Sequence, residues 1–217
     1  VAQQFQRDPG LGQWLQDSDP TQPLAEASLR QTVRELLGDC DNEDELKRAL
    51  RRLRHRHMVR IIWRDLAGMG DYHTTVADLS LLADTLIQEA LSVLHDWACE
   101  KSGTPLGPDG KPVQLVVLAM GKLGARELNL SSDIDLIFAY EHEGEIEGER
   151  RSLSHHQFFV RLGQQLIKAL DQPTADGFVF RVDMRLRPWG KSGVLAIGFD
   201  AMEGYYETQG REWERYA

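Results

Sequence analysis

The sequence is poor in several features that identify a protein class at once. It has 2 cysteines among 217 residues, Cys40 and Cys99, which lie far apart without a C-x-x-C spacing. Neither a disulfide framework nor a thiolate metal site is therefore expected. No apolar run approaches the roughly 20 residues that cross a bilayer. These absences exclude a small disulfide-stapled domain and a helical membrane protein, and they favour a protein of the reducing cytoplasm.

Basic charge is also in short supply. The chain has 25 Lys and Arg against 34 Asp and Glu, a formal net charge of −9 at pH 7. A nucleic-acid binder needs a surplus of basic side chains, so we expect neither nucleic acid nor a membrane as a partner. The 41% hydrophobic and 27% charged residues are close to globular proportions, which excludes a disordered or fibrous chain.

The two ends of the sequence resemble the cut ends of a longer polypeptide. The chain starts at Val1 without the basic and apolar segments of a signal peptide, and its last residues read as part of a helix. We therefore expect a fragment of a longer chain.

The first part of the sequence predicts a helical bundle. Apolar residues recur at helical spacing over residues 24 to 37, along a stripe from Leu46 to Ile61, and over residues 74 to 100. We expect residues 1 to 104 to form a helical N-terminal region. The arginine-rich stretch from 47 to 60 is either a patch for phosphate or an acidic partner, or a solvated helix face paired with nearby acids. The absence of interleaved aromatic residues favours the solvated face.

The composition changes at a turn-rich stretch over residues 103 to 112. Beyond it, residues 105 to 217 predict an α+β fold, a mixed sheet flanked by helices and preceded by the helical bundle. The expected strands cover residues 113 to 120, 134 to 140 and 178 to 186, with a short apolar run ending at 197, and the expected helices cover 154 to 170 and the residues from 199 onward.

A glycine turn follows the first expected strand directly. Gly121 and Lys122 begin the segment Gly-Lys-Leu-Gly and open a helix. Such a turn lets the backbone approach an anionic ligand, and the N–H groups at the start of a helix point toward it. Most turns of this kind are only connections, so the turn alone is weak support for a site.

Two carboxylates, Asp133 and Asp135, stand at the head of the second strand. Side chains alternate across a strand, so these two share one face, opposite the apolar side chains of Ile134, Leu136 and Phe138. Two like charges held this close repel unless a cation lies between them, and oxygen ligands suit Mg²⁺. We therefore expect a metal site in preference to a solvated strand edge.

The third expected strand separates into two faces. Its even-numbered residues from 178 to 186 are apolar, whereas the opposite face carries Arg181, Asp183, Arg185 and Arg187. Asp183 can complete a cluster of three carboxylates around a metal, and the arginines can hold phosphates with their forked donors. The alternative is a ladder of salt bridges across strands.

A glycine turn, a D-x-D motif and a third acid on a neighbouring strand together resemble the nucleotidyltransferase superfamily of the DNA polymerase β type. More specifically, the sequence resembles the family of bifunctional glutamine synthetase adenylyltransferase/adenylyl-removing enzymes, whose members carry two related catalytic halves. The Ser-Ser-Asp-Ile-Asp segment and the Arg-Glu-Trp-Glu-Arg-Tyr ending are similar to the N-terminal half. The resemblance rests on residues 58 to 66, 120 to 129, 131 to 138, 183 to 188 and 209 to 216.

This resemblance implies roles for particular residues. Asp133 and Asp135 are implied as Mg²⁺ ligands and Asp183 as the third catalytic and metal-binding acid. The glycine of the superfamily's Gly-Ser turn is matched by Gly121, and lysine stands in place of the serine, which leaves the phosphate contact at that position open. The residues that the resemblance implies for phosphate or nucleotide binding are Gly121, Lys122, Ser132, Arg185 and Arg187.

The activity implied by the resemblance is removal of AMP from a tyrosine of glutamine synthetase by phosphorolysis. The substrates and products are then inorganic phosphate and ADP, with a PII signal protein as regulator and Mg²⁺ as cofactor. Three alternatives stay open: the half that attaches AMP from ATP, another nucleotidyltransferase of the superfamily, and a non-catalytic module that docks glutamine synthetase or PII. Three intact carboxylates argue against a non-catalytic module.

Overall fold

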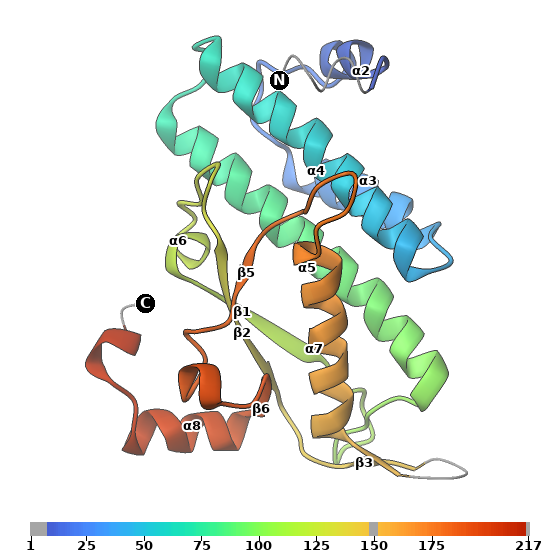
Figure 1. Ribbon diagram of the computed structural model, residues 1–217, viewed down its shortest axis with the longest axis vertical. Coiled ribbons are helices and arrows are strands. Elements are labelled where there is room, and N and C mark those ends of the chain that lie inside the picture. Colours follow the sequence, from blue (N-terminus) through green and yellow to red (C-terminus); the bar gives the residue numbers. More distant parts are fainter. Residues whose placement is uncertain (1–7, 148–151, 216–217) are drawn as a thin grey trace.

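The protein is described by a computed structural model that covers residues 8 to 147 and 152 to 215 (Figure 1). Helices make up most of its first hundred residues, and a small mixed sheet with further helices follows, so the expected α+β class is confirmed. Within the described residues, no helix combines the length and the apolar character needed to cross a membrane. The helices are α2 (Leu11–Asp17), α3 (Glu26–Gly38), α4 (Glu43–Leu66), α5 (Tyr72–Ser102), α6 (Gly121–Gly124), α7 (His155–Asp171) and α8 (Phe199–Thr208), with 3-10 turns η1 (Gly190–Ser192) and η2 (Glu212–Arg215).

Strand β2 is the centre of the sheet. Strand β1 pairs with it in antiparallel register, whereas β5 and β6 both run parallel to it, β5 at its beginning and β6 at its end. The beginning of β2 therefore meets both β5 and the end of β1, and this junction positions the candidate site. The strands are β1 (Leu115–Met120), β2 (Ile134–Tyr140), β5 (Val182–Asp183) and β6 (Ala196–Gly198), with a separate hairpin of β3 (Glu145–Ile146) and β4 (Leu153–Ser154).

Side-chain caps fix where the long helices begin. The Asn42 side chain accepts a hydrogen bond from the N–H of Glu45 at 3.0 Å at the start of α4. Asp71 and Thr74 form a reciprocal capping box at the start of α5, and Ser154 caps α7. Each cap satisfies an N–H that has no partner within the helix, which favours a helix start at that residue.

One hydrophobic core runs through both the helical part and the sheet part. Helices α3, α4 and α5 pack on one another, and α7 packs against both α5 and the sheet (Figure 1). The apolar stripe expected on the second helix is confirmed, because Leu46, Leu50 and Ile61 are all buried. Across the contact between α5 and α7, the rings of His95 and Phe158 meet edge to face at 5.8 Å.

The arginine-rich stretch is a solvated face only in part, because Arg48 and Arg52 are exposed as expected whereas other arginines of the stretch are buried. Arg51 is fully buried. Its guanidinium donates hydrogen bonds to backbone carbonyls at the end of α7 and in the loop that follows, where carbonyls have no partner within the helix. These acceptors, together with one carbonyl of α4 itself, are the oxygens of Ala169, Gln172, Gly177 and Lys47.

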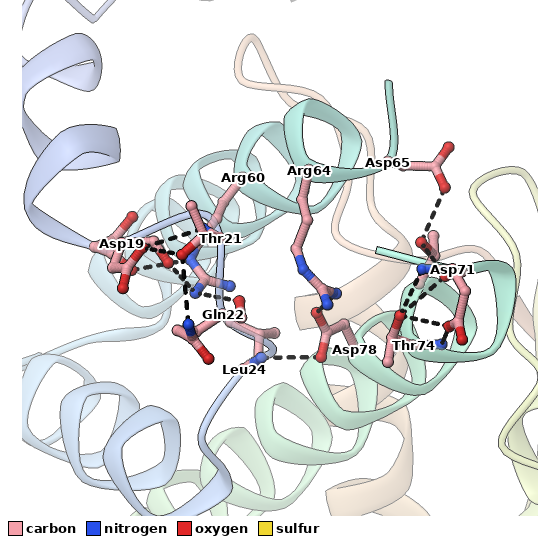
Figure 2. A network of polar contacts seen from close by, with 12 residues as sticks. Asp19, Thr21, Gln22, Leu24, Arg60, Arg64, Asp65, Asp71, Thr74 and Asp78 are labelled. Carbon is pink, nitrogen blue, oxygen red and sulfur yellow. Dashed lines mark hydrogen bonds and ion pairs between the residues drawn. The ribbon is translucent and has the colours of Figure 1, made fainter. Parts of the chain in front are cut away.

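The C-terminal part of α4 uses its arginines in the same way, as Figure 2 shows. Arg60 is buried and donates to the carbonyl of Gln22 at 2.9 Å. Arg64 forms a buried ion pair with Asp78 at 3.2 Å, and Asp78 also accepts a hydrogen bond from the N–H of Leu24 at 2.9 Å. These arginines attach the segment before α3 to the helices, so they stabilise the fold.

The third expected strand is much shorter than predicted. Of residues 178 to 186, only Val182–Asp183 pair with β2. The N–H groups of Val179 and Phe180 instead bond to the Leu170 carbonyl at 2.8 and 3.2 Å, and both side chains are buried, so the alternation of faces fails there. The helices expected over residues 24 to 37, 74 to 100 and 154 to 170 and the strands expected over 113 to 120 and 134 to 140 are confirmed with ends shifted by up to about two residues. The last expected helix is shorter than predicted, because α8 ends at Thr208 and the 3-10 turn η2 follows.

Candidate active site

The acidic residues meet where β1, β2 and β5 come together. Asp135 lies opposite Asp183 in the parallel register of β2 and β5, and opposite Met120 in the antiparallel register of β1 and β2. Gly121 follows directly with φ +56°, and a Cβ atom added there would lie 2.7 Å from Asp135 Oδ2. Only glycine leaves that space free, so Gly121 and the two carboxylates form one site.

The electrostatics of the two carboxylates differ. Burial and the neighbouring charge of Asp183 raise the pKa of Asp135 above its ordinary value. Asp183 accepts hydrogen bonds from Arg185, at 2.6 Å from the guanidinium Nε and at 2.8 Å from the backbone N–H, and these bonds lower its pKa. Arg185 therefore neutralises the Asp183 carboxylate, whereas the charged form of Asp135 would be stabilised by a bound cation.

Asp133 has a different partner, although its charge also contributes to the raised pKa of Asp135. Its carboxylate forms an ion pair with Arg181 at 3.0 Å, and its side chain is 49% exposed. In residues 8 to 147 and 152 to 215, no three His, Cys, Asp or Glu side chains are grouped closely enough to hold one metal ion. The expected three-carboxylate cluster is therefore not assembled, because Arg181 and Arg185 supply the positive charge to the outer two acids.

The donor set nevertheless suits a magnesium ion at Asp135 and Asp183. Both offer hard carboxylate oxygens, and their mutual repulsion contributes to the raised pKa of Asp135. A divalent cation between them relieves that repulsion. Of the three acids, these two lie opposite each other on paired strands.

The residues expected to bind phosphate are only partly brought together. Lys122 Nζ donates to Ser132 Oγ at 3.3 Å, and Ser132 Oγ donates to Asn129 Oδ1 at 2.8 Å. The helix expected after the glycine turn is a single turn, Gly121–Gly124, so the stabilisation of an anion by a helix dipole does not apply. Next to the Gly121 turn, the side chains of Lys122 and Ser132 are therefore the hydrogen-bond donors available to a phosphate.

Arg187 has a different position from the one expected of a phosphate ligand. Its guanidinium donates to the backbone carbonyls of Met184, Lys191 and Gly193, at 2.6 to 3.3 Å. These bonds close the loop that follows β5. Arg187 thus holds the loop, whereas Arg185 lies directly against Asp183.

The C-terminal motif reaches the same loop through α8. Trp189 Nε1 donates to the side chain of Gln209 at 2.9 Å, and the rings of Trp189 and Tyr205 lie 4.6 Å apart. The Tyr205 hydroxyl donates to Glu214. The motif therefore supports the loop after Asp183, and its last residue, Tyr216, lies outside the described residues.

Sequence reasoning missed two residues near the Asp133–Arg181 ion pair, Arg54 and Phe178. The guanidinium carbons of Arg54 and Arg181 each lie 5.8 Å from the centroid of the Phe178 ring. Arg54 stands four residues from Leu50 and four from Met58, both buried, so it occupies an inward position of α4. The sequence did contain a signal for Arg54, because it stands at a position where the helical period predicts an apolar residue.

Two carboxylates on adjacent strands, a glycine turn and a surrounding set of Lys and Arg define a site suited to phosphoryl groups and a divalent cation. Comparison with known proteins agrees with a protein that acts on phosphoryl groups. The family model for glutamate-ammonia ligase adenylyltransferase matches residues 1 to 217. The chain belongs to that family.

The relatives carry one common name, bifunctional glutamine synthetase adenylyltransferase/adenylyl-removing enzyme. The chain is 55% identical over its whole length to the protein of Pseudomonas aeruginosa and 47% identical to that of Shewanella woodyi. It is 56% identical over 83% of its length to the protein of Nitrosococcus oceani. The match covers 22, 23 and 19% of these proteins, so the chain spans about a fifth of the length of the curated relatives it matches.

Proposed function

We propose that this chain carries a magnesium-dependent nucleotidyltransferase site of the polymerase β type. In this proposal it removes AMP from a tyrosine of glutamine synthetase by phosphorolysis. The observation that supports it best is the pairing of Asp135 with Asp183 beside Gly121. The relatives' name, which includes adenylyl removal from glutamine synthetase, supports the substrate. A PII signal protein is proposed as the regulator on the family resemblance.

The proposed reaction exchanges one phosphorus–oxygen bond for another. An oxygen of inorganic phosphate attacks the phosphorus of the AMP group, and the bond from that phosphorus to the tyrosine oxygen breaks. The tyrosine oxygen leaves and takes up a proton, and the products are ADP and the unmodified tyrosine. Negative charge accumulates on the phosphoryl oxygens during the exchange, so the site has to stabilise charge and position the attacking oxygen.

The side chains divide this task. Asp135 and Asp183 would hold Mg²⁺, with Asp133 as a further ligand once it separates from Arg181. When bound, Mg²⁺ supplies positive charge at the phosphoryl oxygens. Lys122, Ser132 and Arg185 orient the phosphates from either side of the acids, and Arg187 keeps the loop behind Asp183 in place through its carbonyl bonds.

Replacement of one central acid tests the proposal. We expect Asp135→Asn to reduce phosphate-dependent ADP release from AMP-modified glutamine synthetase by at least about a hundredfold, because several kcal/mol of charge stabilisation depend on the metal. Asp41→Asn, at an exposed carboxylate before α4, is the matched control and should retain full activity. Calorimetric titration with Mg²⁺ should show weaker binding only in Asp135→Asn.

Unimpaired ADP release by Asp135→Asn contradicts the proposed site. The direction of the reaction is measured in the same preparation. Incorporation of AMP from ATP into unmodified glutamine synthetase, without phosphate-dependent release, would assign this chain the opposite activity.

A further inference from the structure

A small cavity adjoins the Asp133–Arg181 ion pair, where α4 meets the loop before β2 and the segment leading into β5. Its volume is about 40 Å³. A water-sized group needs about 10 to 15 Å³ of such space, so the cavity admits two or three oxygen-sized groups and excludes an adenine ring. Residues that line it include Arg54, Asn129, Ser131, Ser132, Phe178 and Arg181.

Arg54 brings a positive charge into this cavity without a matching negative one. Its Nε atom is buried and has no hydrogen-bond partner among the described residues. Burial lowers the pKa of Arg54, and no carboxylate in residues 8 to 147 or 152 to 215 opposes that shift. A partly buried guanidinium whose Nε has no hydrogen-bond partner is costly, and an anion bound in the cavity would offset that cost.

The neighbouring guanidinium of Arg181 differs from that of Arg54 in having an ion pair. Arg181 lies against the same Phe178 ring as Arg54, but it is neutralised by Asp133 at 3.0 Å. Arg54 forms no ion pair within the part of the chain that the structure describes. The two arginines bring like charges to one aromatic ring, and an anion beside Arg54 removes the imbalance.

The geometry points to Arg54 as a further phosphate-binding residue, which takes a phosphoryl oxygen of inorganic phosphate or of a nucleotide in this cavity. Ser132 and Asn129 are further polar residues of the cavity lining, and Ser132 is hydrogen-bonded to Lys122. The helical part of the chain thereby contributes directly to the site. The inference rests on the proposed function only in that the site handles phosphoryl groups.

Calorimetric titration of the full chain with inorganic phosphate, and separately with ADP, tests this role. We expect Arg54→Ala to weaken binding of one or both probes about tenfold or more, because a charge-assisted forked contact is lost. Arg54→Lys should fall between, since lysine keeps the charge but not the fork. Arg52→Ala is the matched control, an exposed arginine on the same helix, and should bind both probes as the unaltered chain does.

Weakening confined to phosphate assigns the cavity to the attacking phosphate, and weakening confined to ADP assigns it to the nucleotide. Thermal unfolding of each variant without ligand shows whether it folds. If Arg54→Ala does not fold, the binding of phosphate and ADP to Arg54→Lys tests the inference. In the release assay, Arg54→Lys should raise the KM for phosphate more than it lowers kcat.

Affinities within about twofold of the unaltered chain, or an equal loss in Arg52→Ala, overturn the inference. Absence of phosphate and ADP binding to the unaltered chain overturns it too. The two proposals fail separately: if phosphate binding depends on Arg54 while ADP release survives Asp135→Asn, the metal site is wrong and the role of Arg54 stands.

Discussion

Gly121 shows how a single residue controls the site. Its positive φ and the 2.7 Å approach that a Cβ atom would make to Asp135 Oδ2 both require glycine. The obstructing group is the end of a side chain and can move, so the fold tolerates an added methyl group better than the chemistry does. The residue is therefore needed chiefly to keep the Asp135 carboxylate in position.

We expect Gly121→Ala to lower ADP release about tenfold or more by displacing the Asp135 carboxylate. The left-handed conformation should cost about 1–2 kcal/mol of the free energy of unfolding. Gly204→Ala is the control, because Gly204 lies inside α8 with open space around it and alanine there should stabilise by up to about 1 kcal/mol. Equal activity losses in the two variants, measured beside their Tm values, would contradict this role of Gly121.

At the scale of the element, α4 combines structural and functional tasks on one helix. Arg51, Arg60 and Arg64 are buried and bind carbonyls or Asp78, whereas Arg54 faces the cavity beside the site. This concentration of positive charge also acts on His57, whose Nδ1 is buried without a hydrogen-bond partner among the described residues. The helix therefore keeps His57 neutral.

The electrostatics of α4 predict a pH dependence of stability. Burial, with Arg60 and Arg56, lowers the pKa of His57 from 6.5 to about 4. The unfolded chain then binds a proton below pH 6.5 that the folded chain does not bind until about pH 4. The free energy of unfolding should fall by about 2 kcal/mol between pH 7 and pH 5 from this group alone.

Urea unfolding at pH 7 and at pH 5 measures this contribution. The difference between the two values should shrink by about 2 kcal/mol in His57→Gln. His73→Gln, at an exposed histidine of α5, should leave it unchanged. An undiminished difference in His57→Gln would show that His57 titrates normally in the folded chain.

At the scale of the whole molecule, the helices and the sheet share one core. Helix α7 packs against α5 on one side and the sheet on the other, and Phe158 is in contact with His95 across that boundary. The helical region and the sheet region should therefore unfold together. The orientation of Arg54 toward the cavity depends on this common core.

We expect Phe158→Ala to destabilise the whole chain by about 3–5 kcal/mol, since it removes a fully enclosed aromatic side chain. Tm should fall by roughly 6–20 °C for a chain of this size. Circular dichroism and tryptophan fluorescence should report the same single transition. Phe199→Ala, at a side chain that is 39% exposed, should change Tm much less, and two separate transitions would disprove a shared core.

The pattern of apolar residues predicted most elements because a helix or strand must bury one face. Strand β2 is found over the predicted residues, and the buried Ile134, Leu136 and Phe138 lie as the alternation required. The same alternation failed over residues 178 to 186. There the hydrogen bonds of Val179 and Phe180 go to the end of α7, a partner far away in the sequence.

Local periodicity and residue type are enough to predict the α+β class, the main helices and strands, and the D-x-D motif. The partner of each charged side chain became known from the three-dimensional arrangement. It placed Asp183 opposite Asp135, gave Asp133 to Arg181, assigned Arg187 to loop carbonyls and turned Arg54 toward the cavity. The positions of Asp183, Asp133 and Arg54 depend on contacts between segments distant in the chain. The carbonyls bound by Arg187 lie within six residues of it, in a loop whose conformation the alternation of side chains did not predict.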